Sequence, residues 1–352
     1  MRSYLVIGDE KTARWSKAMS FVTFVKHVKR IAEKKKAEFH ILSYKQVLEE
    51  DLPASIKDNV LVFLFFPFSY WNKNIEVYDK DKRIYGDSHF HNEYKKFLIL
   101  IDKTIRQAYK GKHIKYFNPP LSSLTERDKK KTYTLLKKKN VNTPKIYDVK
   151  NLSDAKKLIK KRKKFYIKPR FGAMGKGVSY FQGDKLITNF IYRNNQVISK
   201  KADYGWKFKI LNKRDWSGFI NIMVNKGYIF QESIEHPVYR QNIYDFRVHV
   251  VYGETPYFYA KTMPKAIPVT NWSQGGRIQK RGKLYKIMTE EELTKIRRMA
   301  VKATNALGLN YAGVDVLMSE DHSKFYCLEL HSFPGYEKGF DIMEYIAKHT
   351  IK

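Results

Sequence analysis

The sequence predicts a protein of mixed α/β and α+β class that is built from more than one module. Two observations lead to this prediction: apolar strand-like runs alternate with helix-like runs over residues 1 to about 115, and the last third of the chain carries long strands around one helix. The third observation is size, because 352 residues with 43% apolar and 15% aromatic side chains can fill two or three cores.

The first block predicts a small α/β domain with a mainly parallel sheet. The runs "SYLVIG", "AEFHILS" and "NVLVFLFFPF" are typical of strands, and residues 18–34 and 92–109 are typical of helices. The opening "MRSYLVIGDEK" becomes charged too early for a signal peptide, and no run of about 18 uncharged apolar residues occurs in the chain. We therefore expect a soluble cytoplasmic protein with no membrane segment.

Two α+β lobes are expected after the "NPP" at 118–120. The segment "SLTERDKKKTYTLLKKKNVNTPKIYDV" predicts a capped helix that Asn140 and Pro144 end, followed by a strand. From about Gln231 the sequence predicts long strands, a helix over 290–307, and a strand pair at "YAGVDVLMS" and "KFYCLEL". This order of elements predicts two lobes that face each other.

The charge balance is strongly basic, because 68 Lys and Arg against 35 Asp and Glu leave a net charge of +33. Basic clusters such as "KHVKRIAEKKK" and "KKLIKKRKK" alternate with apolar helix positions, which predicts solvated faces of folded helices. One interpretation is a lysine-rich proteome, either thermophilic or from an AT-rich genome. The other is a polyanionic partner such as an acidic peptide, a phosphorylated surface or RNA, bound in a salt-dependent way. A homo-oligomer also stays open.

A glycine-rich loop follows one apolar strand in "FYIKPRFGAMGKGVSYF", residues 165–181. Lys168 ends the strand, and Gly172, Gly175 and Gly177 follow it closely. Glycines so spaced predict a loop whose backbone comes close to a ligand, and phosphate is the usual ligand of such loops.

Polar residues in the last two apolar strands have no evident structural purpose. Asp315 follows "AGV", and Glu329 stands two residues before His331 in "FYCLELHSFPG", so both should project from one face of a strand. Buried carboxylates repel each other unless a cation lies between them, and Mg²⁺ on a substrate phosphate is such a cation. Salt bridges to the abundant lysines are the alternative. Cys327, in the same apolar run, is expected to be a buried and inert thiol.

Seven segments stand in a fixed order between about residue 124 and the C-terminus: "RDKKKTYTLLKKKNVNTP", "YIKPRFGAMGKGV", "FQESI", "YDFRVHVV", "NWSQGGR", "AGVDVL" and "LELHSFPG". In this order they resemble the ATP-grasp superfamily, most closely its branch of glutathione synthetases and ribosomal-protein glutamate ligases, and they are similar to spore-coat-associated ATP-grasp proteins. The resemblance implies two lobes that close on ATP. It divides the chain into a pre-ATP-grasp domain at 1–115, an N-lobe with a glycine-rich lid at 116–230, and a C-lobe with a metal site at 231–352.

The resemblance also implies which residues bind the nucleotide. Lys168 would contact its phosphates, the loop with Gly172, Gly175 and Gly177 would cover them as a lid, and Lys129 would be a second nucleotide lysine. One more lysine in a basic helix is the alternative for Lys129. The hinge with the adenine and ribose would contain Gln231, Glu232 and Ser233.

Four further positions are implied around the ribose and the reacting groups. Asp245, Arg247 and Asn271 would contact the ribose or the phosphates. Arg277 would steady a reacting acyl phosphate. Of these, Arg247 and Arg277 are the predicted catalytic residues.

Asp315, Glu329 and His331 occupy the three metal-ligand positions that the resemblance implies, with Glu329 bridging two magnesium ions. The usual third ligand of the family is an asparagine, whereas an imidazole nitrogen prefers manganese or zinc. His331 therefore has three open roles: ligand of the second metal, cationic contact to phosphate, or neither. The implied cofactors are ATP with Mg²⁺ or Mn²⁺.

Three functions follow from this site. The first is an ATP-dependent carboxylate-amine ligase that forms an amide through an acyl phosphate, acting on an amino acid, a peptide or a protein tail. The second is a kinase that phosphorylates a hydroxyl of a polyanionic substrate. The third is an ATP-binding interaction protein whose catalysis has decayed at His331.

Overall fold

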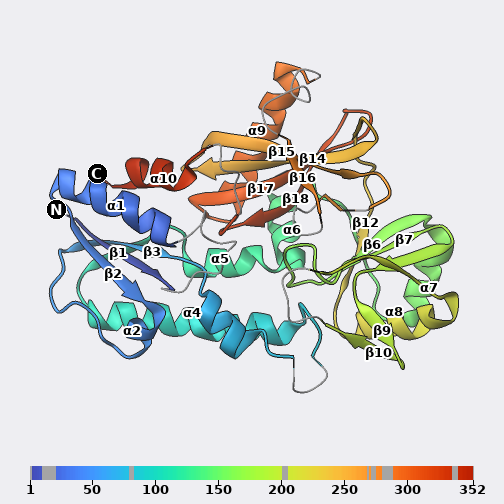
Figure 1. Ribbon diagram of the computed structural model, residues 1–352, viewed down its shortest axis with the longest axis horizontal. Helices are drawn as coiled ribbons and strands as arrows, with labels where there is room; N and C mark the ends of the chain where they lie inside the picture. Colours follow the sequence, from blue (N-terminus) through green and yellow to red (C-terminus); the bar gives the residue numbers. More distant parts are fainter. Residues whose placement is uncertain are drawn as a thin grey trace.

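The computed structural model describes residues 2–9, 21–78, 83–199, 205–267, 269–270, 275–279, 288–334 and 340–351. These residues form three sheets and a separate hairpin, with helices on their faces (Figure 1). No helix in this described part is both long and apolar enough to cross a lipid bilayer.

The first sheet is parallel, as predicted. Its part of the chain contains β1 (Arg2–Gly8), α1 (Phe21–Lys35), β2 (Glu38–Ser43), α2 (Tyr44–Leu48), β3 (Asn59–Leu64), α3 (Phe68–Tyr70), the π-helical turn η2 (Trp71–Ile75), α4 (Ser88–Ala108) and β4 (His113–Tyr116). The strand order is β2-β1-β3-β4. Strand β1 is buried over consecutive residues because helices cover both faces of the sheet.

One helix on this sheet comes from the other end of the chain. Helix α10 (Ile342–Thr350) packs beside α1 on one face, and α2 and α4 pack on the other. The two ends of the chain therefore lie close together at the left of Figure 1. Helix α4 begins at Ser88 and not at the predicted residue 92, because the Asp87 carboxylate caps it by accepting from the His89 amide at 3.0 Å.

The second sheet is antiparallel and lies at the right of Figure 1. Its elements are β5 (Ile146–Tyr147), α7 (Leu152–Lys161), β6 (Lys164–Lys168), β7 (Ser179–Gln182), β8 (Lys185–Thr188), β11 (Lys209–Leu211), the 3₁₀ turn η3 (Lys213–Asp215), α8 (Trp216–Asn225) and β12 (Ile229–Glu232), with the hairpin β9 (Ile191–Arg193) and β10 (Gln196–Ile198). The strand order is β11-β8-β7-β6-β12-β5. Apolar residues of α7 and α8, Ala155 and Phe219 among them, bury one face of this sheet.

The third sheet is also antiparallel and carries the long strands that the sequence predicted. Its elements are β13 (Val238–Tyr239), β14 (Asn242–Val251), β15 (Glu254–Pro264), β16 (Arg277–Gln279), α9 (Glu290–Ala306), β17 (Tyr311–Met318) and β18 (Phe325–His331). The order is β16-β15-β14-β17-β18, with β13 paired to β14. Helix α9 covers one face, and it begins at a capping box formed by Thr289 and Glu292.

Two helices connect the sheets, α5 (Pro120–Glu126) and α6 (Lys129–Lys138). Tyr133 and Leu136 of α6 lie in the core under the third sheet, and the Tyr133 hydroxyl donates to the Leu328 carbonyl at 2.8 Å. The domain boundaries at 115 and 230 stay a prediction, since α6 and α10 each pack on a sheet far from them in sequence. Cys327 is buried in the same core, as expected, and burial raises the pKa of its thiol.

Candidate functional site

A pocket of about 720 Å³, open to solvent at its mouth, lies between the second and third sheets. Nine of the predicted site residues line it, and they are Lys129, Lys168, Gly172, Gly175, Gln231, Glu232, Asp245, Asp315 and Glu329. The structure therefore brings to one place residues from strands, loops and a helix that are up to about 200 positions apart.

The two-residue repeat of the third sheet explains how polar residues reach this pocket. Along β14, Tyr244, Phe246 and Val248 point into the core under α9. The intervening residues Asp245 and Arg247 must therefore project from the opposite face. On β17 the residues flanking Asp315 lie in that same core, so Asp315 shares the open face.

Pairing between strands then places charged side chains next to each other. Asp315 lies opposite Arg247 on one side and opposite Glu329 on the other. Lys261 of β15 lies opposite Asp245. Directly opposed residues of antiparallel strands have Cβ atoms about 5 Å apart, so these side chains must interact.

A β-bulge in β18 turns Glu329 toward the pocket. Asp315 pairs with Glu329, but the next residue, Val316, pairs with Cys327, so Leu328 has no partner across the strand pair. Cys327 faces the core under α9, and strict alternation would have sent Glu329 there too. The bulge reverses this alternation and sets Glu329 beside Asp315.

Asp315, Glu329 and His331 form a cluster whose ligand atoms all lie within 4.8 Å of one another. The His331 Nε2 atom is 3.6 Å from Asp315 Oδ2 and 3.5 Å from Glu329 Oε2. Two carboxylates and one imidazole on adjacent strands fit a divalent cation, with oxygen donors suited to magnesium and a nitrogen suited to manganese. The predicted metal ligands are thus adjacent, and their role as ligands stays a prediction.

Cations of the protein neutralise both carboxylates of the cluster. Arg247 makes a bidentate salt bridge with Asp315, with its Nε atom 2.5 Å from Oδ1 and a terminal nitrogen 3.0 Å from Oδ2. The Lys261 Nζ atom lies 3.0 Å from the same Oδ2 atom. Burial alone would raise the pKa of Asp315, but these two cations outweigh it and hold the pKa well below its ordinary value. For Glu329, burial is likewise outweighed by Lys129, 3.2 Å away, and its pKa is lowered.

The two predicted nucleotide lysines lie on the same side of the pocket. Lys129, at the start of α6, contacts Glu329 and donates to the Gly172 carbonyl, so it joins the acidic cluster to the glycine loop. Lys168, at the end of β6, lies over the Tyr166 ring with its Nζ atom 4.5 Å from the ring centre. Burial lowers the pKa of Lys168 to about 8, although Glu329 acts in the other direction.

The glycine loop joins β6 to β7, and its shape requires glycine. Gly175 and Gly177 have φ of 64° and 68°, where a side chain is strained. A Cβ on Gly172 would lie 2.4 Å from the Pro169 ring, so only glycine fits that close approach. The loop lines the pocket through Gly172, Ala173 and Gly175, and binding of a ligand by its main chain stays a prediction.

Residues of the first part of the chain hold this loop. The Ala173 amide donates to the Tyr85 hydroxyl at 2.8 Å, and that hydroxyl contacts the Ala173 carbonyl at 3.0 Å. The buried Lys176 pairs with Glu76 at 3.2 Å, with its ammonium 4.6 Å from the centre of the Tyr85 ring. The position of the loop thus depends on contacts that span about 100 residues of sequence.

The predicted hinge lies on β12 at the edge of the pocket. Gln231 is buried, and its Oε1 atom has no hydrogen-bond partner among the described residues, so it can accept from a ligand in the pocket. Glu232 accepts from the Lys145 amide at 3.1 Å.

Thirteen described lining residues were not predicted as site residues, and the polar ones among them include Lys176, His236, Lys261 and Thr270. Lys261 is the most important, because it is buried between Asp245 at 3.2 Å and Asp315 at 3.0 Å. A signal for it exists in "YFYAKTM", where one charged residue interrupts an apolar strand. His236 is also distinctive, since burial, followed by Lys168 and Lys261, lowers its pKa to about 4.

Six predicted residues do not line the pocket or cannot be placed. Arg277 lies on the edge strand β16, and its side chain is exposed. Arg247 and His331 lie behind the lining and reach it through Asp315, while Gly177 and Ser233 flank it. Asn271 lies outside the described residues.

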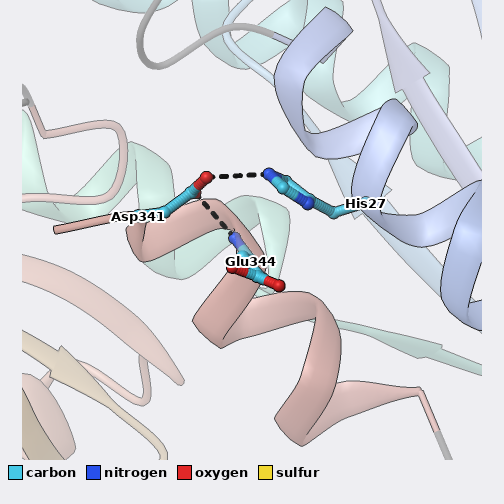
Figure 2. Close-up of side chains that lie close together, drawn as sticks. All are labelled: His27, Asp341 and Glu344. Atoms are coloured by element: carbon cyan, nitrogen blue, oxygen red, sulfur yellow. Dashed lines mark hydrogen bonds and ion pairs between the residues drawn. The ribbon is translucent and has the colours of Figure 1, made fainter.

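A second cluster of metal-ligand types, His27 with Asp341 and Glu344, joins α1 to α10 (Figure 2). The His27 ring lies 2.8 Å from Asp341, whose other oxygen caps α10 by accepting from the Glu344 amide at 2.9 Å. Glu344 already pairs with Arg30 at 2.6 Å and Lys348 at 3.0 Å. The cluster therefore ties α1 to the start of α10.

Comparison with known proteins identifies related sequences. Residues 113–351 match a family described as YheC/D-like ATP-grasp. The chain is 32% identical over 232 residues to the tetrahydromethanopterin:α-L-glutamate ligase of Methanocaldococcus jannaschii, and the match covers 65% of either chain.

Solved structures share the fold at low sequence identity. A RiPP-associated ATP-grasp ligase of Chryseobacterium gregarium, in complex with ADP and a leader and core peptide, matches with a TM-score of 0.57 at 14% identity, over 99% of this chain and 96% of that one. The ATP-grasp ligase PsnB, with a minimal precursor, Mg and ADP, matches with a TM-score of 0.55 at 14% identity, over 98% and 96%.

Proposed function

Because the chain belongs to the YheC/D-like ATP-grasp family, we propose that it is an ATP-dependent ligase that joins a carboxylate to an amine. Family membership also confirms the predicted fold class. The substrates that we propose are an amino acid or a peptide, which the names of the glutamate ligase and of the peptide-bound ligase support.

One observation carries the proposal: Lys129 and Lys168 lie in the same pocket as the acidic cluster of Asp315 and Glu329. Phosphoryl transfer needs positive charge around the migrating group and little covalent chemistry from the protein. The two lysines and the amides of the glycine loop supply that charge on one side of the pocket. Asp315, Glu329 and His331 would hold Mg²⁺ or Mn²⁺ next to them, since Lys129 lies 3.2 Å from Glu329.

The proposed reaction follows from these positions. The substrate carboxylate attacks the γ-phosphorus of ATP, and the bond from that phosphorus to the bridging oxygen breaks. The products of this step are ADP and an acyl phosphate. An amine then attacks the acyl carbon, phosphate departs, and the amine proton passes to solvent or phosphate. A bound divalent cation would neutralise charge on the transferring phosphoryl group.

The protein residues would act by position and charge. Lys168 would bind the phosphates, with Gln231 at the adenine edge. Arg247 and Lys261 would hold Asp315 ionised and oriented toward the metal, since both contact its carboxylate. The glycine loop would exclude water, which would otherwise hydrolyse the acyl phosphate.

The test is ATP turnover with ATP labelled in the γ-phosphate, using a panel of amino acids and dipeptides as carboxylates and α-L-glutamate as the first amine. A ligase releases ADP and free labelled phosphate and forms an amide only when both substrates are present. Label found in a stable phosphoester would instead indicate the kinase. ATP binding without turnover, in magnesium or manganese, would indicate the decayed binding protein.

A matched pair of variants ties the activity to this site. Glu329→Gln should reduce turnover at least tenfold, because it removes charge from the metal cluster. Glu291→Gln, on the exposed surface of α9 and paired only with Lys295 among the contacts described, should leave turnover unchanged. Equal activity of the two variants would contradict the assignment of the site.

A further inference from the structure

A second pocket lies where the first sheet meets the end of β18. It is lined by Phe24 of α1, residues 63–65 at the end of β3, residues 117–118 after β4, and residues 332–334 after β18. Tyr311 and, on α10, Met343 and Ile346 complete it. Its space, including the part that is open to solvent, is about 450 Å³. None of the predicted site residues that the structure describes belongs to it.

The position of this pocket is typical of a substrate site. In open parallel sheets, ligands bind at the carboxyl ends of the strands, near the point where the strand order reverses. Here the chain runs from β1 outward to β2 and returns to β3 on the other side of β1. Residues 63–65 and 117–118 lie at the carboxyl ends of β3 and β4, so the pocket opens at that edge.

The pocket also adjoins the acidic cluster through neighbouring residues of β17 and β18. Ser332 directly follows His331, and Pro334 packs on Gly313, which pairs with His331 across the strands. Tyr311 begins the strand that carries Asp315, and four residues of strand span about 13 Å. A substrate of two to four residues could therefore reach from the acidic cluster into the pocket.

The described lining residues offer no charged partner to an occupant. Three described lining residues carry polar side-chain groups, and each is engaged. Asn118 accepts from the Asn310 and Tyr311 amides and donates to the Tyr311 carbonyl. The Ser332 hydroxyl donates to Glu126, and the Tyr311 hydroxyl lies 3.3 Å from His249. The rest of the described lining is apolar, with five phenylalanines.

The α10 wall of the pocket is held in place from outside. The contacts of His27 with Asp341 and of Arg30 with Glu344 tie α10 to α1, as Figure 2 shows for His27 and Asp341. Met343 lies between these anchored positions and faces the pocket. The pocket is thus a built cavity with a defined wall.

We infer that this pocket binds a large apolar side chain, aromatic or branched aliphatic, of the carboxylate substrate, which is a short peptide or a similar molecule. The inference rests on the proposed ligase function, because the acidic cluster marks where the carboxylate reacts. It names a substrate class that the family and the nucleotide pocket leave open. The apolar group lies within about 13 Å of the reacting carboxylate.

Two variants test the pocket itself without any turnover. Leu64→Trp adds bulk at the half-buried end of β3 and should fill the pocket, whereas Leu121→Trp adds the same ring on the exposed face of α5 as a control. N-acetyl-L-phenylalaninamide, which has no carboxylate, should bind the full-length protein in saturation-transfer NMR, and N-acetyl-L-alaninamide should not. Leu64→Trp should weaken that binding at least tenfold, and the control should not change it.

Turnover then separates this inference from the proposed function. Dipeptides with Phe or Leu next to the terminal residue should be used at least tenfold better than those with Ala, Glu or Lys, and Leu64→Trp should abolish the preference. Met343→Ala, which enlarges the pocket, should shift the preference toward Trp. If the probe binds at the pocket but no substrate is ligated, the proposed ligase function is wrong and the apolar pocket is still supported. The inference that the pocket binds an apolar side chain would be overturned by ligation that shows no preference for apolar dipeptides. It would also be overturned if Leu64→Trp folds but changes neither probe binding nor substrate preference.

Discussion

Lys261 gives the sharpest test of the electrostatic argument, because its ammonium lies 3.2 Å from Asp245 and 3.0 Å from Asp315. All three side chains are nearly inaccessible to solvent. Lys261→Met keeps the length of the side chain and removes its charge. Asp315 keeps its contact with Arg247, but the buried Asp245 loses the cation beside it and still lies near the Asp315 carboxylate. Breaking a buried ion pair from one side typically costs about 3–5 kcal/mol, so we expect a loss of that size in the free energy of unfolding.

A matched control is available on the surface. Lys295 pairs with Glu291 at 2.7 Å on α9, and both side chains are exposed. Such surface pairs contribute roughly 0–1 kcal/mol, so Lys295→Met should be nearly neutral. Denaturant unfolding, followed by circular dichroism and tryptophan fluorescence, measures both variants.

The pH dependence of the variant adds a second measurement. Burial already raises the pKa of Asp245, and loss of Lys261 removes the cation that opposes this rise. In Lys261→Met the folded state should therefore bind a proton more tightly than the unfolded state, and the deficit should shrink as the pH falls. Adding Asp245→Asn should recover part of the lost stability at pH 7. The reasoning fails if Lys261→Met costs no more than Lys295→Met, or if the double variant recovers nothing.

Four further predictions concern the nucleotide, the metal, the loop and stability. Lys168→Ala should weaken ATP binding by roughly 1.5–3 kcal/mol, because a charge-assisted contact is lost, and calorimetric titration that finds unchanged affinity would exclude a phosphate contact. His331→Asn should shift the metal optimum from manganese toward magnesium, and identical metal titrations of parent and variant would show that His331 is not a ligand. Tyr85→Phe removes the hydroxyl that Ala173 contacts and should increase hydrogen exchange of the glycine loop at least tenfold, whereas unchanged exchange would mean that this contact does not hold the loop. Burial, and then Arg247, lowers the pKa of His249 to about 3, so below pH 6.5 the unfolded chain takes up a proton that the folded protein does not. The free energy of unfolding should therefore fall by roughly 2 kcal/mol between pH 7.5 and pH 5. An equal fall with pH in His249→Gln would refute this prediction.

Much of the fold could be predicted from local patterns. The parallel strands of the first sheet appear as continuous apolar runs, and the helix over 290–306 follows a capping box that is visible in the sequence. The sequence predicted that α4 starts at residue 92, but the helix starts at Ser88. Its N-cap residue, Asp87, precedes polar and aromatic residues that do not stand out as the first turn of a helix.

The candidate site was partly visible for the same reason. Asp315 and Glu329 stand out because charged residues are rare in apolar strands, and the glycines of the loop stand out by their spacing. Lys261 is likewise a charged residue in an apolar strand, but the sequence analysis did not predict it as a site residue. Its partners Asp245 and Asp315 lie on neighbouring strands.

The sequence by itself determined which residues form strands, where the glycine loop lies and which carboxylates are buried, since these depend on neighbours a few positions away. The tertiary structure alone decided their partners. The bulge at Leu328 turns Glu329 to the pocket, Lys176 meets Glu76 across 100 residues, and α10 closes the apolar pocket on the first sheet. Each of these contacts depends on strand register and on the packing of distant segments, and a two-residue or 3.6-residue repeat contains no information about either.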